Sequence, residues 1–143
     1  MDPVTIVTSA LGTAAIAVRL SKTLSDVVTS IGDAPEDVQA LQDEVDTVHS
    51  AIVHIKGLLE DTEREWSHTW VEDVDKALDR SGDALIKIHV IVSKWKGTGK
   101  IGRAGQTWMG FRWTLKDSEV ARLMRRLESS KTALLLLIGA GSL

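Results

Sequence analysis

The chain has 143 residues, a formal net charge of −3 and no cysteine. This length fits one domain that buries its own core, and the lack of cysteine excludes disulfides, thiolate metal sites and thiol nucleophiles. The net charge provides no general attraction to nucleic acid. The two prolines are Pro3 and Pro35, so nothing after residue 35 interrupts a long helix.

Residues 3–31 are expected to form one long helix whose N-terminal half is uncharged. No charged residue occurs from Pro3 to Val18. The run lacks the basic flank of a secretory signal peptide. Its 16 residues are also fewer than the roughly 20 that a resident membrane span needs.

Two adjacent apolar stripes follow this expected helix. The first stripe consists of Val4, Val7, Leu11, Ala14 and Val18. The second stripe consists of Ile6, Ala10, Ala17, Leu20, Leu24, Val27 and Ile31. A helix on the outside of a bundle needs only one such face. The extra stripe indicates either a central position in the bundle or a contact with something else, and the pattern leaves both open.

Three more helices are expected, over residues 35–62, 66–96 and 117–138, because their apolar residues recur in steps of three and four. These positions are Val38, Leu41, Val45, Val48, Ile52, Ile55 and Leu59; Val71, Val74, Leu78, Ser81, Leu85, Ile88, Val92 and Trp95; and Val120, Leu123, Leu127, Ser130, Leu134 and Leu137. Long helices with short connections predict an all-α, antiparallel four-helix bundle.

The ends of the last helix carry their own predictions. Asp117 is expected to cap its N-terminus, and Gly139 and Gly141 are expected to end it. The consecutive apolar residues 134–138 are expected to be buried on several sides of the helix.

Charge is distributed unevenly along the chain. Residues 33–65 hold ten acids and two bases, whereas residues 94–116 hold six bases and no acid. Within the second region, residues 94–113 predict a Gly/Trp-rich basic loop between the third and fourth helices. Such a loop suits anionic lipid headgroups or single-stranded nucleic acid, or it is simply solvated. The candidate lipid- or partner-contacting residues are Lys94, Lys96, Lys100, Arg103, Trp108 and Arg112.

No motif in the chain predicts catalysis. The sequence GTGKIG at residues 97–102 lacks the Ser or Thr, and the preceding strand, of a phosphate-binding Walker loop. The four histidines show no metal-ligand spacing, and the paired acids lie off the apolar stripes on solvated helix faces. We therefore expect no enzymatic activity, no cofactor and no nucleic-acid partner.

Three stretches together resemble a known family: MDPVTIVTSALGTAAIAVRLSKTLSDVV, DVQALQDEVDTVHSAIVHIKGLL and FRWTLKDSEVARLMRRLESSKTALLLLI. They are similar to the HeLo-like domains of filamentous fungi, the N-terminal domains of NLR-type receptors and amyloid-signalling proteins. The most specific features are the uncharged N-terminal helix and the pattern Arg112-Trp113-x-Leu115-Lys116-x-x-Glu119. The resemblance spans nearly the whole chain, residues 1–143, as one domain.

The resemblance implies a fold and a function. HeLo-like domains are helical bundles similar to the four-helix domain of the mixed-lineage kinase domain-like protein, and they execute or control regulated cell death. An upstream receptor or amyloid partner nucleates homo-oligomers, and the N-terminal helix then leaves the bundle and enters the plasma membrane. The implied location is therefore the cytoplasm at rest and the plasma membrane, with its anionic lipid, after activation.

Carried onto this sequence, the resemblance assigns membrane insertion to Pro3, Val4, Ile6, Val7, Ala10, Leu11, Ala14, Ile16 and Val18. We expect these residues to be buried at rest and to seek the membrane once released. Only Asp2 matches the early acidic residue that family members often carry. A second hypothesis is a homotypic interaction module, in which the opening helix is the central core helix and the acidic second helix pairs with the basic loop of another protomer.

Overall fold

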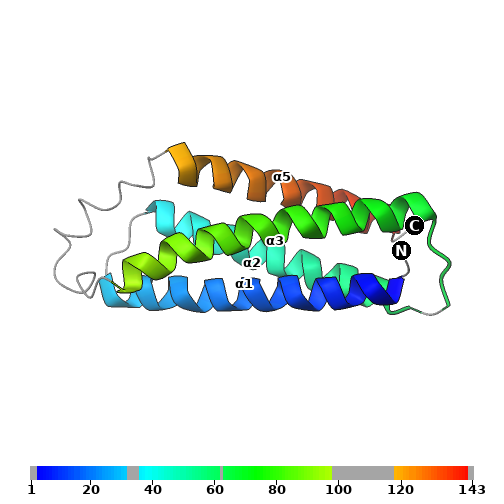
Figure 1. The fold of residues 1–143 in the computed structure, drawn as a ribbon, viewed down its shortest axis with the longest axis horizontal. Helices are drawn as coiled ribbons and strands as arrows, with labels where there is room; N and C mark the ends of the chain where they lie inside the picture. The colour runs from blue at the N-terminus through cyan, green and yellow to red at the C-terminus, as the bar shows by residue number, and fades with distance from the viewer. Residues whose placement is uncertain (1–2, 32–35, 62, 98–117, 142–143) are drawn as a thin grey trace.

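A computed structural model describes the chain over residues 3–31, 36–61, 63–97 and 118–141. It contains four α-helices: α1 (Pro3–Ile31), α2 (Glu36–Leu59), α3 (His68–Gly97) and α5 (Ser118–Gly141). Consecutive helices run in opposite directions, and the four helices pack together along their length (Figure 1). The predicted all-α four-helix bundle is therefore confirmed. Of the predicted Gly/Trp-rich loop, residues 94–97 instead form the last turn of α3, which ends one residue beyond the predicted 96. The rest of that loop and the predicted cap Asp117 lie outside the described residues.

The four helices form a square in which α1 and α5 occupy opposite corners. Each of these two packs against both α2 and α3, whereas α2 and α3 touch each other only weakly. As a result α1 runs parallel to its neighbour α3, and the connection from α2 to α3 crosses the end of the bundle that also holds both chain termini (Figure 1). α1 is thus a corner helix with one side facing outward, and the alternative of a central helix is wrong.

The apolar positions predicted from the spacing form the core. All seven on α2 are buried, and the most exposed of them, Leu59, is only 5% exposed. On α3 the series from Val71 to Val92 is buried, and on α5 Leu123, Leu127 and Leu134 are buried. The side chains of Trp95 and Val120 lie outside the described part. Ser81 belongs to the same series because its hydroxyl donates to the carbonyl of Ala77 at 2.7 Å, which satisfies it inside the core.

α1 turns its second stripe inward. The residues of this stripe that the structure describes are fully buried: Ile6, Ala10, Ala17, Leu20, Leu24 and Val27. The first stripe faces away from the core or lies at its edge. The reason is length: the second stripe stays apolar along the helix, whereas the first ends at Val18 and is followed on the same face by Lys22 and Ser25.

Side-chain caps explain why the helix ends differ from the predicted ones. α2 ends at Leu59, three residues earlier than predicted, and Asp61 then accepts a hydrogen bond from the backbone of Glu63 at 3.1 Å. α3 begins at His68 rather than residue 66, because the hydroxyl of Ser67 accepts from the backbone N–H of Trp70 at 3.1 Å. Ser67 is therefore the N-cap of α3.

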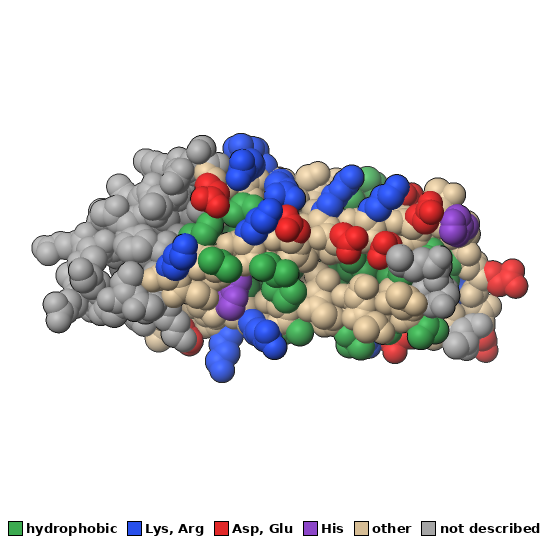
Figure 2. All heavy atoms as spheres, in the orientation of Figure 1, with side chains coloured by type: hydrophobic (Ala, Val, Ile, Leu, Met, Phe, Trp, Pro, Cys, Tyr) green, Lys and Arg blue, Asp and Glu red, His purple; other side chains and the backbone are tan. Residues whose placement is uncertain are grey.

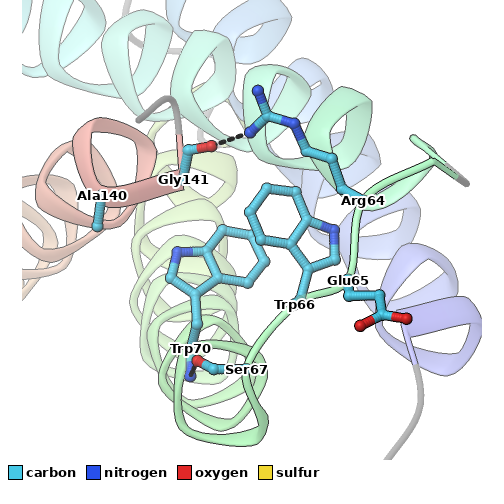
Figure 3. Close-up of a pocket in the computed structure, with 7 residues that line it drawn as sticks. All are labelled: Arg64, Glu65, Trp66, Ser67, Trp70, Ala140 and Gly141. Atoms are coloured by element: carbon cyan, nitrogen blue, oxygen red, sulfur yellow. Dashed lines mark hydrogen bonds between the residues drawn. The ribbon is translucent and has the colours of Figure 1, made fainter.

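α5 continues through Gly139 and ends at Gly141, three residues beyond the predicted end. The last carbonyls of a helix lack partners within the helix. Here the Arg64 guanidinium donates to the carbonyl of Gly141 (Figure 3). One turn earlier, Trp70 Nε1 donates to the carbonyl of Leu137 at 3.0 Å. Trp66 and Trp70 stack with ring centroids 4.1 Å apart and cover Gly141. We name these three side chains, Arg64, Trp66 and Trp70, the α5 clamp.

Candidate functional site

The most unusual surface of the bundle is the side of α1 that faces solvent. Val4 is 75% exposed, Leu11 52% and Val18 51%. We call these three residues the outer face of α1; it lies opposite the buried stripe. A corner helix ordinarily carries charged side chains there, as α2 does with the exposed Asp43 and Asp46. The outer face of α1 is instead apolar and uncharged.

The neighbouring helix α3 also exposes apolar residues. Ile86 and Val90 of α3 are each 49% exposed. Ile86 lines a groove between α1 and α3 together with Gly12 and Ile16. Apolar side chains accordingly lie along the edge of the molecule over α1 and on the adjoining surface of α3 (Figure 2). The sequence analysis missed Ile86 and Val90, and the available signal was that both are apolar although they lie off the core-facing positions of α3.

The predicted membrane-inserting residues divide into three groups. Ile6 and Ala10 are buried, as expected at rest. Val7, Ala14 and Ile16 are half-buried and pack against the edge of the core. Val4, Leu11 and Val18 are exposed, so the expectation that the whole set is buried at rest is wrong for these three. The side chain of Pro3, the first residue of α1, lies outside the described part.

As a whole, α1 is longer and more apolar than its uncharged run suggests. Residues Val4–Thr29 are long and apolar enough to cross a membrane, with a mean hydropathy of 1.5 in the most apolar stretch. Only 28% of that stretch is buried in the bundle. The core helix of a soluble protein meets the same criterion of length and hydropathy, but it buries most of its residues. A signal sequence near an N-terminus also meets this criterion, so length and hydropathy permit a membrane span without requiring one.

Three hydroxyl groups in the N-terminal half of α1 find their partners within the helix itself. Thr8 Oγ1 lies 3.4 Å from the carbonyl of Val4, and Ser9 Oγ lies 3.5 Å from that of Thr5. Thr13 Oγ1 donates to the carbonyl of Ser9 at 2.9 Å. Such bonds to the preceding turn keep a hydroxyl satisfied wherever the helix goes, including into lipid.

The C-terminal half of α1 is tied to both neighbouring helices by polar side chains. Ser21 Oγ donates to Asp46 of α2 at 2.7 Å. Thr23 Oγ1 lies 3.4 Å from Nε2 of His89 on α3 and also donates to the carbonyl of Arg19 at 3.0 Å. Ser93 Oγ lies 3.5 Å from the same ring nitrogen, so His89 Nε2 is shared between a residue of α1 and one of α3. We call Ser21–Asp46 and Thr23–His89 the two tethers of α1.

Of the predicted basic contact residues, the structure describes few. Lys94 is an exposed residue of α3, and Lys96 belongs to the same helix although its side chain lies outside the described part. Lys100, Arg103, Trp108 and Arg112 lie outside the described residues. Two other cations, Arg19 and Lys22, are exposed on α1 directly after its apolar half.

A second apolar surface lies on α5, at the opposite corner of the bundle. Leu136 is 70% exposed and Leu135 47% exposed, whereas Leu134 is fully buried. The prediction that residues 134–138 are buried on several sides is therefore wrong for two of them. α5 is a corner helix, so a run of consecutive apolar residues necessarily places some of them outward. We call Leu135 and Leu136 the α5 face.

Comparison of the chain with protein families, with characterised proteins and with solved structures finds no match. The molecule is a four-helix all-α protein. Its candidate site is the outer face of α1, which lies on the uncharged half of that helix. The following half carries exposed cations and both tethers.

Proposed function

We propose that this chain is a HeLo-like executor of regulated cell death, which permeabilises membranes through the N-terminal half of α1. The observation that carries the proposal is that the outer face of α1 is apolar, uncharged and exposed in the folded bundle. Transfer of apolar surface from water into lipid is favourable by about 25 cal/mol per Å². Arg19 and Lys22 follow this surface, and each base near an anionic headgroup adds about 1 kcal/mol.

The proposed mechanism has two steps. The bundle first binds anionic lipid through the outer face of α1, without unfolding. The N-terminal half of α1 then exchanges its core contacts, chiefly those of Ile6 and Ala10, for lipid contacts. The hydroxyls of Thr8, Ser9 and Thr13 keep their bonds to the preceding turn during this exchange, so these three groups are not stranded in the hydrocarbon.

Several copies must act together. The uncharged segment of 16 residues extends about 24 Å as a helix, which is less than the roughly 30 Å of the hydrocarbon core. A single segment therefore does not cross an undisturbed bilayer, whereas a cluster thins it. This requirement agrees with activation by homo-oligomerisation under an upstream NLR-type receptor or amyloid partner. The protein is then cytoplasmic at rest and acts at the plasma membrane.

A reversible staple between α1 and α3 tests the proposal. A Cβ atom on Gly82 would lie 3.4 Å from Thr13 Oγ1 and 3.7 Å from its Cγ2, so cysteine side chains at these two positions would be within reach of each other. The chain contains no other cysteine. The variant Thr13→Cys/Gly82→Cys should release dye from phosphatidylserine-containing vesicles when reduced and should release none when oxidised. The two single-cysteine variants are the matched controls, and both should leak under either condition.

Two outcomes contradict the proposal. One is equal dye release from the oxidised and the reduced double variant, which would show that α1 need not leave α3. The other is a wild-type protein that binds the vesicles and never releases dye at any protein-to-lipid ratio.

The α5 face supports a second candidate function, a homotypic interaction module without membrane activity. Leu135 and Leu136 lie at the corner opposite the outer face of α1, and two different apolar surfaces on opposite sides of a molecule permit head-to-tail association. Light scattering without lipid distinguishes the candidates. Concentration-dependent assembly that Leu136→Gln abolishes, together with no dye release, favours the interaction module.

A further inference from the structure

We infer that α1 consists of two segments with different attachment to the bundle: a releasable segment, residues 3–18, and an anchored segment, residues 19–31. The boundary lies at Arg19, two residues before the first tether. The inference rests on the proposed function for its biological meaning, because it names the part of α1 that leaves and the contacts that keep the rest in place. The two segments differ in three independent features.

The first feature is the size of the residues that face the core. In the releasable segment these are small apart from Ile6, namely Ala10, Thr13 and Ala17. Of its other large side chains, Val7 and Ile16 are half-buried at the edge of the core, and those of the outer face point to solvent. In the anchored segment the large residues Leu20, Leu24 and Val27 are all fully buried. Departure of the releasable segment therefore exposes less apolar surface per residue than departure of the anchored one.

The second feature is the polar attachment. The anchored segment has both tethers, one to α2 through Ser21–Asp46 and one to α3 through Thr23–His89. In the releasable segment the hydroxyls of Thr8, Ser9 and Thr13 are bonded to their own helix backbone. These three hydroxyls therefore give the releasable segment no hydrogen bond to a neighbouring helix.

The third feature is the contrast with the other terminal helix. α5 ends at the same end of the bundle as α1 begins (Figure 1). Its last turn is held by the α5 clamp, in which Arg64 and Trp70 donate to the carbonyls of Gly141 and Leu137. The weak attachment of the releasable segment is thus a property of α1 rather than of chain ends in this bundle.

Hydrogen exchange of the wild-type chain in buffer, without lipid, tests the inference. Amides 7–18 should exchange at least about tenfold faster than amides 22–29, with a step near Arg19. The first four amides are left out because they have no partner within the helix. The last two turns of α5 should exchange as slowly as amides 22–29. Uniform protection along α1, or a gradual slope through Arg19, overturns the inference.

Removal of the tethers provides a second measurement. In the variant Ser21→Ala/Thr23→Val, fast exchange should spread into residues 22–29 while residues 7–18 keep their wild-type rates. An effect confined to residues 7–18 overturns the assignment of the tethers. Deletion of the hydroxyls alone is a small change at two partly exposed positions, so the bundle remains folded.

A matched pair of cysteine variants tests the same difference in local opening by thiol labelling instead of hydrogen exchange. Ala10 on α1 and Ala84 on α3 are both fully buried alanines, and the chain has no cysteine of its own. Ala10→Cys should react with a thiol reagent at least about tenfold faster than Ala84→Cys. Equal rates contradict the inference. Because these measurements contain no membrane, a clear step without dye release would remove the proposed function and leave the two-segment structure standing.

Discussion

Substitution of the outer face of α1 separates membrane binding from folding. The variant Val4→Thr/Leu11→Gln/Val18→Thr replaces three apolar side chains that are 75%, 52% and 51% exposed. Complete transfer of such a side chain from water into lipid contributes about 2 kcal/mol. Scaled by the exposed fractions, the three contribute about 3.5 kcal/mol, and their loss should weaken binding to anionic vesicles about 300-fold.

Vesicle sedimentation across a range of lipid concentrations measures this change. The free energy of unfolding in urea should stay within about 0.5 kcal/mol per site of the wild-type value, because the side chains are already exposed. The variant Leu135→Gln/Leu136→Gln makes the same kind of change on the α5 face and should bind vesicles like the wild type. Wild-type binding by the α1 variant, or an equal loss in both variants, refutes the argument that α1 is the membrane-facing helix.

Two further predictions concern the stability of the bundle. Gly141→Ala should lower the free energy of unfolding by about 1–3 kcal/mol in urea, because the new methyl group would lie 3.1 Å from the Trp70 ring. Gly139→Ala, with nothing within 4 Å of the new methyl group, should raise it by about 0.5–1 kcal/mol; the same sign for both variants contradicts the packing argument. A hydrogen bond from Lys87 holds the pKa of Asp83 below its ordinary value. A lowered folded-state pKa adds stability that is present above about pH 4 and is lost as the pH falls through that pKa. Asp83→Asn should therefore lower Tm near pH 6 and leave it unchanged at strongly acidic pH; an equal decrease at both pH values contradicts this assignment.

The apolar residues that recur in steps of three and four predicted the fold, because the core of a bundle consists of one continuous apolar stripe from each helix. On α2 every such position, from Val38 to Leu59, is buried. The sequence was ambiguous only on α1, where two stripes compete. The stripe ending in Leu24 and Val27 faces inward because Lys22 interrupts the other one, and this interruption was visible in the sequence.

The errors arose where distant parts of the chain meet. Gly139 predicted a helix end, yet α5 continues because Arg64 and Trp70, about 70 residues earlier, supply donors to its last carbonyls. No local pattern contains that information. The outward positions of Leu135 and Leu136 likewise depend on α5 being a corner helix, which follows from the packing order rather than from helix periodicity.

The candidate site was predictable in part. The absence of charge from Pro3 to Val18 identified the helix half, and the resemblance assigned it a function. The sequence did not show that part of this half is already exposed, because exposure depends on which stripe the core selects. The tethers Ser21–Asp46 and Thr23–His89 were not predictable, since each joins residues of two helices whose register only the packed bundle fixes.

The weak contact between α2 and α3 has a consequence for any opened state of the bundle. These two helices are held together by α1 and α5, so departure of residues 3–18 leaves a trough between them rather than a closed three-helix core. The floor of this trough contains Gly82 and Leu78, which line the present boundary with α1. The trough would have the shape of residues 3–18. A free peptide with the sequence of residues 3–18 is therefore the natural competitor for the trough, and it would hold the protein open.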